Sequence, residues 1–117
     1  MPVTIDDVRA TTSTFPRSYE AEVRGCARFR VGRIVYAGFG RDESAMGIAF
    51  PKGMREGIVS GEPDKFVMPR ASDLRYNWIG VRLDAIDAAE LRELLEDAWT
   101  MVVPKSVAAA YFGDALT

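Results

Sequence analysis

Residues 24–41, RGCARFRVGRIVYAGFGR, decide the fold class of this chain. Residues 28–31 and 34–39 contain many of the β-branched and aromatic side chains that favour strands, and only Gly32-Arg33 separates the two runs. A glycine at the first position of a two-residue loop is typical of a type II′ hairpin turn. The turn predicts an antiparallel hairpin with four pairs: Val31 with Ile34, Arg30 with Val35, Phe29 with Tyr36, and Arg28 with Ala37.

The predicted pairs sort the hairpin's side chains into two sets, because side chains alternate between the two faces of a strand. The core face is expected to carry Phe29, Val31, Ile34 and Tyr36. The opposite face is expected to carry Arg28, Arg30, Val35, Ala37 and Phe39. The hairpin would therefore present its arginines to solvent or to a ligand.

Short apolar runs at residues 45–50, 65–68 and 78–83 predict three further strands. Thr4 and Asp7 have the spacing of a capping box and predict a helix that ends near Thr12. Shorter helices are expected at 18–24, 51–61 and 105–112. The best-marked helix begins after Asp87 and ends before Pro104, with apolar residues at helical spacing on one face.

The principal elements follow the order α-β-β-β-α-β-β-α. This order predicts an α+β fold, a two-layer sandwich in which helices cover one face of an antiparallel five-stranded sheet. With 117 residues, the chain is expected to form a single domain over residues 1–117. The predicted core contains Phe29, Tyr36, Ile48, Val81, Leu94, Leu95 and Trp99.

The chain contains no histidine and one cysteine, Cys26. Catalytic triads, cysteine–histidine zinc sites and internal disulfides are therefore excluded. Because no activated nucleophile or matched acid–base pair is visible, we expect no enzymatic activity, no cofactor and no metal. The N-terminal residues lack the pattern of a secretory signal, and no apolar run has the length of a membrane helix. We expect a cytoplasmic protein that does not enter the membrane.

Three stretches resemble the MmcQ/YjbR family of small bacterial proteins. They are ARFRVGRIVYA (27–37), GIAFPKGMREGIV (47–59) leading to EPDKFVMP (62–69), and NWIGVRLDAIDAAELRELLEDAW (77–99) followed by VVPK (102–105). The resemblance implies the compact fold of that family, which is related in architecture to secretion-chaperone-like domains. It also implies a double-wing arrangement of the kind found in DNA-binding proteins, in a family whose biochemical function is poorly defined.

Charge is distributed unevenly along the chain. Residues 24–41 hold five arginines and no acidic residue, and residues 65–83 hold four basic residues and one acid. The two hairpins thus carry +5 and +3, which leaves −10 for the rest of a chain whose net charge is −2. Such a basic surface suits a polyanion such as DNA. The predicted contact residues are Arg28, Arg30, Arg33, Arg41, Arg70, Arg75 and Arg82, with Tyr76 and Trp78 as stacking groups.

Two other interpretations of the same surface remain open. Small residues between the arginines would let a partner's backbone approach, so the face could be a protein-interaction or homodimerisation surface. The predicted floor of that surface comprises Ala37, Gly47, Ala49 and Gly80. Alternatively, the arginines are only the solvated side of an open sheet, where they discourage aggregation.

Overall fold

Antiparallel strands form one open sheet of six strands in the order β1-β2-β3-β4-β6-β5. The computed structural model describes residues 2–116. The strands are β1 (Ser18–Val23), β2 (Cys26–Val31), β3 (Ile34–Phe39), β4 (Ala45–Ala49), β5 (Phe66–Val67) and β6 (Trp78–Arg82). The helices are α1 (Ile5–Thr12), α2 (Arg55–Gly61), α3 (Ala88–Thr100) and α4 (Lys105–Leu116), with short 3₁₀ turns at Lys52–Met54, Ala71–Asp73 and Leu83–Ala85.

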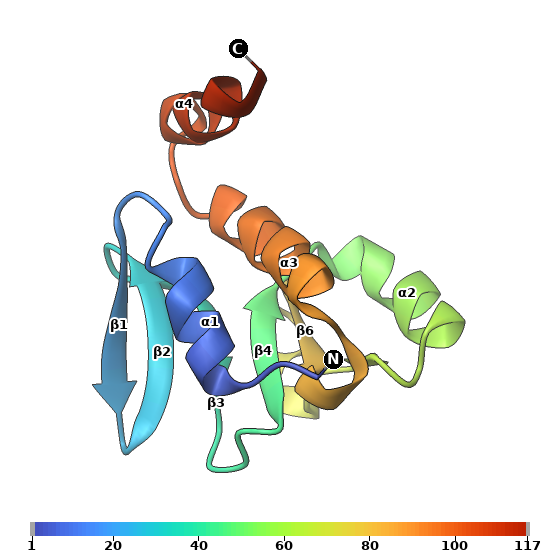
Figure 1. The fold of residues 1–117 in the computed structure, drawn as a ribbon. Coiled ribbons are helices and arrows are strands. Elements are labelled where there is room, and N and C mark those ends of the chain that lie inside the picture. The colour runs from blue at the N-terminus through green and yellow to red at the C-terminus, as the bar shows by residue number, and fades with distance from the viewer. Residues whose placement is uncertain (1, 117) are drawn as a thin grey trace.

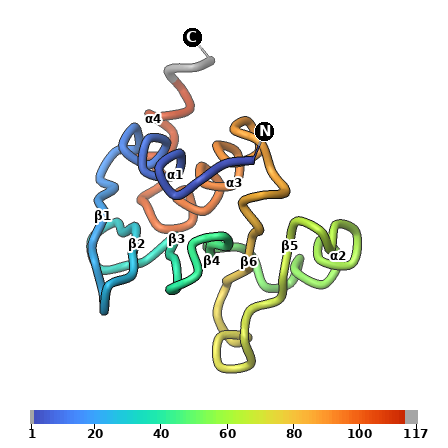
Figure 2. The backbone as a smooth tube through the Cα atoms, turned by 60° about the horizontal axis from the view of Figure 1, so that its bottom comes forward, coloured from blue at the N-terminus to red at the C-terminus, as the bar shows by residue number. Residues whose placement is uncertain are grey.

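The helices α1 and α3 pack against each other on one side of the sheet, and α3 contacts β3 and β4 (Figure 1). Helix α2 lies beside β5 at one edge. Figure 2 shows α1 and α3 above the strands and the yellow loop before β6 on the opposite side. The predicted α+β class, with helices covering one face of an antiparallel sheet, is confirmed.

The sheet has one strand more than predicted, because residues 18–23 form β1 and not a helix. Arg24 and Gly25 join β1 to β2 with φ angles of 54° and 79°. Two successive positive φ angles are the signature of a type I′ turn, whose twist matches that of paired strands. The Arg-Gly pair was the turn signal in the sequence, and pairing with β2 overrides the weak helical tendency of SYEAEV.

The hairpin β2–β3 confirms the predicted turn but not the whole register. Val31 pairs with Ile34 and Arg30 with Val35, and the register then shifts between Phe29 and Arg30. This β-bulge makes Tyr36 an extra residue of β3, so Phe29 pairs with Ala37 and Arg28 with Gly38. Ala37 and Phe39 consequently lie in the core, contrary to the prediction, and Gly38 faces the open side. Ile34, beside the turn, is 55% exposed and does not join the core.

Six of the seven residues predicted for the core are buried, and Leu94 is half-buried against them. Trp99 on α3 packs against Phe15, Tyr111 and Phe112, which joins α4 and the segment before β1 to the same core. Helix α3 starts as predicted, with Asp87 Oδ1 accepting from Glu90 N at 2.9 Å. Asp87 and Glu90 also have the spacing of a capping box, but the Glu90 side chain instead accepts a hydrogen bond from Lys65 Nζ at 2.8 Å.

We predict that Tyr36 makes stability sensitive to alkaline pH. Its hydroxyl lies 2.5 Å from Ser18 Oγ, and burial raises the pKa of Tyr36 to about 12. Because the unfolded phenol ionises near pH 10, the contribution of the neutral phenol is intact below about pH 10 and is lost as the pH rises towards 12. Urea unfolding at several pH values measures this loss. The Tyr36→Phe variant should lose less stability across that range, and an equal loss would contradict the assignment.

Candidate functional site

The face of the sheet that points away from α1 and α3 is here called the outer face. Side chains alternate between the two faces along each strand, and residues that pair directly across two strands share a face, so the residues between the buried ones form the outer face. One row across the sheet consists of Arg28, Gly38, Gly47 and Gly80, each paired with the next. Arg30 pairs with Val35, Ala49 with Trp78, and Ala45 with Arg82. The outer face therefore combines arginines with small residues, as the sequence predicted.

A groove of about 590 Å³ crosses the outer face. Its floor is formed by β3 and β4 and includes Gly38, Gly47 and Ala49. The loop between β5 and β6, which Figure 2 shows projecting from this side of the sheet, supplies one wall with Arg70, Asp73, Tyr76 and Asn77, and Trp78 at the start of β6 continues it. Ile34 and the residues that follow α3, Met101 and Val102, also line it.

Arg28 lies in the groove but is held by its own hairpin. Its Nη1 donates to the carbonyl oxygens of Ala27, at 3.1 Å, and Phe39. The aliphatic part of the side chain covers Gly38, where an added Cβ would lie 2.9 Å from Arg28 Cδ. Because its guanidinium is held by these carbonyl oxygens, this half-buried arginine contributes positive charge at a fixed position and is not free to move towards a ligand.

Trp78 covers the glycine in the middle of the floor. A Cβ on Gly47 would lie 2.3 Å from Trp78 Nε1 and 2.6 Å from Cε2, so the indole rests directly on the Gly47 backbone. Trp78 Nε1 donates no hydrogen bond within the described part of the chain, and the side chain is half-buried. Of the predicted floor of Ala37, Gly47, Ala49 and Gly80, Ala37 lies in the core, where the bulge puts Gly38 in its place on the outer face. Gly47 is covered by Trp78, and Gly80 has Val67 O 3.1 Å from its ideal Cβ position.

Arg55 supports the groove from beneath and was not identified from the sequence. It is 7% exposed. Its guanidinium donates to the carbonyl oxygens of Leu74, Tyr76 and Trp78 at 2.6, 3.0 and 3.2 Å. Asn77 ties the same loop to the segment before α2, because its Oδ1 accepts from Lys52 N at 3.0 Å. Nothing local in the sequence marks Arg55, since its partners lie about twenty residues further along the chain.

The loop carries two exposed arginines at the rim of the groove. The Arg70 side chain is 81% exposed, and its Nε lies 3.6 Å from Asp73 Oδ2. Arg75 lies over the Tyr76 ring, with Cζ 4.8 Å from the ring centroid, and its Nη2 donates to the Tyr76 hydroxyl at 2.7 Å. One face of Tyr76 is therefore already occupied by a cation.

The structure brings together only part of the predicted contact set. Arg28, Arg70, Tyr76 and Trp78 line the groove, and Arg75 stacks on Tyr76. Arg30 is the outer-face residue next along β2, and Arg33 lies in the β2–β3 turn. At the other end of the sheet, Arg82 pairs with Ala45 at the start of β4, and Arg41 follows Gly40 in the loop before that strand.

The acidic residues lie mainly on the helix side of the sheet. Glu20 and Glu22 of β1 pair with the core residues Phe29 and Ala27, and therefore face the same side. Helices α1 and α3 add Asp6, Asp7, Glu90, Glu93, Glu96 and Asp97. Lys65 lies among acids, and its hydrogen bond with Glu90 raises the pKa of Lys65. The helix side of the sheet is therefore mainly acidic, and its cations Arg9 and Arg92 form ion pairs with acids there.

No group of three or more aspartate, glutamate, cysteine or histidine residues within residues 2–116 is arranged to hold a metal ion. Among the helices described, none combines the length and the apolar character needed to cross a bilayer.

Comparisons with known proteins agree with the fold. The family model named YjbR matches residues 10–101. The crystal structure of Deinococcus radiodurans protein DR2400, of the DUF419 domain family, superposes with a TM-score of 0.73 at 22% identity, covering 94% of this chain and 88% of that one. No curated protein matches the sequence. Because the YjbR model covers most of the chain, including both hairpins and α3, this protein belongs to the YjbR family.

Proposed function

We propose that the protein binds nucleic acid through the outer face of its sheet. The observation that carries the proposal is the separation of charge: arginines of β2, β6 and the loop before β6 lie on or around the outer face, and most acids of α1, α3 and β1 lie behind it. A surface polarised in this way attracts a polyanion and orients the acidic helices away from it, although the net charge is −2.

The exposed arginines at the groove rim make the first contacts. Arg70 and Arg75 are exposed residues of the loop, Arg75 lying over the Tyr76 ring, and both can reach phosphates without disturbing the sheet. Arg28 and Arg30 are half-buried and add to the positive potential at the centre of the face. Because these groups contact the phosphate backbone, they carry little sequence information, and we expect weak sequence preference.

The salt dependence of binding tests the proposal. Fluorescence anisotropy with labelled duplex and single-stranded DNA should show binding at low salt. For duplex DNA, engaging about five phosphates gives a slope of log affinity against log salt of about −4 to −5. Replacing Arg70 and Arg75 together by glutamine should make that slope shallower by about two and weaken all sequences alike.

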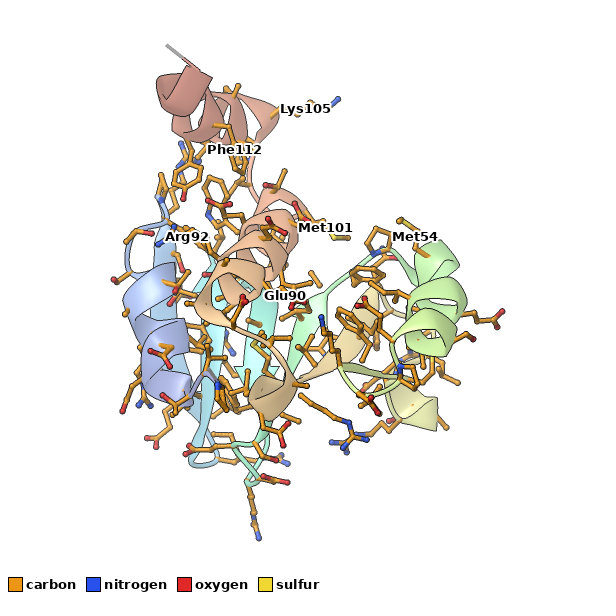
Figure 3. The ribbon with its side chains drawn as sticks, turned by 45° about the vertical axis from the view of Figure 1, so that its right-hand side comes forward. Met54, Glu90, Arg92, Met101, Lys105 and Phe112 are labelled. Carbon is orange, nitrogen blue, oxygen red and sulfur yellow. The ribbon has the colours of Figure 1, made fainter. Side chains whose placement is uncertain are left out.

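Lys105→Gln serves as the matched control. Lys105 is exposed at the start of α4 and points away from the body of the sheet (Figure 3), so its loss should leave the slope unchanged. An equal effect of Lys105→Gln would show that only net charge matters. Absence of binding at tens of micromolar protein would overturn the proposal.

A second candidate function, protein interaction or homodimerisation, is favoured by the apolar side chains around the groove. Ile34, Tyr76 and Met101 line it and are all exposed. The small residues of the floor do not add to this argument. Arg28 covers Gly38 and Trp78 covers Gly47, so a partner's backbone cannot approach either glycine. Light scattering at high micromolar concentration separates the two functions: a dimer that dissociates in Ile34→Arg would support interaction, and a monomer would exclude homodimerisation.

A further inference from the structure

We propose that the groove is specific for single-stranded nucleic acid, with one base stacked on a face of the Trp78 indole, whose Nε1–Cζ2 edge is held against Gly47. The inference rests on the proposed function and narrows its substrate class. Bases in a duplex are stacked on one another, whereas those of a single strand can stack on an aromatic ring.

The first step is the close packing of the Trp78 indole against Gly47, which fixes the position of the ring. Trp78 rests on Gly47 so closely that a single methyl group there would overlap Nε1, Cε2 and Cζ2, with distances of 2.3, 2.6 and 2.7 Å. Arg55 Nη1 donates a hydrogen bond to Trp78 O at 3.2 Å and so fixes the backbone of the same residue. A half-buried ring fixed in this way loses little side-chain entropy when a base stacks on it.

The second step compares Tyr76, in the loop before β6, with Trp78, the first residue of β6, as the ring on which a base stacks. Arg75 already covers one face of Tyr76 and engages its hydroxyl. Trp78 has no such cation, lines the groove itself, and keeps an indole N–H that makes no hydrogen bond within residues 2–116. An indole in this position offers a ring face to a base.

The third step is the charge around the ring. Arg28 and Arg70 line the same groove as Trp78, and Arg75 is adjacent to it through Tyr76. Sequence-tolerant single-strand sites combine a stacking ring with cations that follow the backbone in this manner. Asp73 is the acidic residue in the groove lining, and Arg70 lies 3.6 Å from it.

The experiment compares two labelled eight-nucleotide probes, oligothymidylate and an abasic strand with the same phosphates but no bases. The native protein should bind oligothymidylate more tightly. Trp78→Leu should weaken oligothymidylate binding by about 5- to 150-fold, equivalent to about 1–3 kcal/mol of stacking, and should leave abasic binding and its salt slope unchanged. Trp99 is fully buried, so the quenching of tryptophan fluorescence by oligothymidylate should disappear in the same variant.

Gly47→Ala tests whether the packing of Trp78 against Gly47 positions the ring, and Gly40→Ala is its matched control. The added methyl group displaces the indole in the first case and meets nothing within 4 Å in the second, although both glycines line the groove. Only Gly47→Ala should lose the preference for oligothymidylate over the abasic strand. An unchanged preference would overturn the role of Gly47. If Gly47→Ala fails to fold, Trp78→Leu still decides the stacking.

The outcomes separate this inference from the proposed function. Equal binding of the two probes to the native protein, or equal weakening of both by Trp78→Leu, would overturn the stacking inference while leaving phosphate-driven binding in place. Failure of duplex, oligothymidylate and abasic strand alike to bind would overturn both.

Discussion

Trp99→Ala is expected to lower the free energy of unfolding by about 3–5 kcal/mol, the range found when large aromatic residues are removed from cores. Trp99 is fully buried, and its ring centroid lies 5.5 Å from that of Phe15 and 5.1 Å from that of Tyr111. Its Nε1 donates to Pro16 O at 3.0 Å. The substitution therefore removes the side chain that joins α3 to α4 and to the segment before β1.

Urea unfolding followed by circular dichroism measures this loss. Thr100→Ala is the control, because Thr100 is exposed on the next position of α3 and its replacement should change stability by about 0.5 kcal/mol or less. Trp99→Phe keeps most of the buried surface and should retain much of the stability. A cost below about 1 kcal/mol for Trp99→Ala would show that the aromatic cluster is not part of the folded core.

Arg55→Met is expected to cost about 2–4 kcal/mol. The guanidinium donates to three backbone carbonyl oxygens of residues 74–78, and a hydrogen bond that involves a charged group has a net contribution of about 1.5–3 kcal/mol. Removing them leaves buried acceptors without donors, while the relief of a buried charge offsets part of the loss. Arg55→Lys should recover only part of the stability, because an ammonium group cannot reproduce the planar fork.

The same substitution should loosen the wall of the groove. In Arg55→Met, acrylamide should quench Trp78 more strongly than in the native protein, since the carbonyl of Trp78 loses its donor. Lys52→Met is the matched control from the same segment, because Lys52 is exposed and its Nζ contacts only Arg75 O, at 3.3 Å. Unchanged stability and quenching in Arg55→Met would contradict the assignment of Arg55 as the anchor of this loop.

Local patterns in the sequence were sufficient for most of the elements. The Gly32-Arg33 turn, the strands on either side of it and helix α3 were all predicted, because φ preferences, apolar periodicity and capping act over a few residues. The positions of Leu95, Trp99 and Ile48 in the core follow from the same periodicity. The order of the elements predicted helices on one face of an antiparallel sheet, and the family resemblance predicted membership that the YjbR match over residues 10–101 confirms.

The bulge at Tyr36 and the strand β1 depended on contacts across the sheet. A bulge is selected by packing against neighbouring strands and not by the turn beside it, so the register predicted from Gly32-Arg33 failed after two pairs. Likewise, SYEAEV becomes a strand because β2 offers it a partner edge.

The sequence by itself determined that the chain has no histidine and one cysteine, and where its positive charge lies along the chain, because both follow from counting residues. Only the tertiary structure decided what those charges surround. Folding placed the Trp78 ring on Gly47, a residue of another strand, and brought Arg55 under a loop about twenty residues away. Such contacts join segments that are far apart in the sequence, so no local pattern predicts them. They form only when β4 and β6 pair.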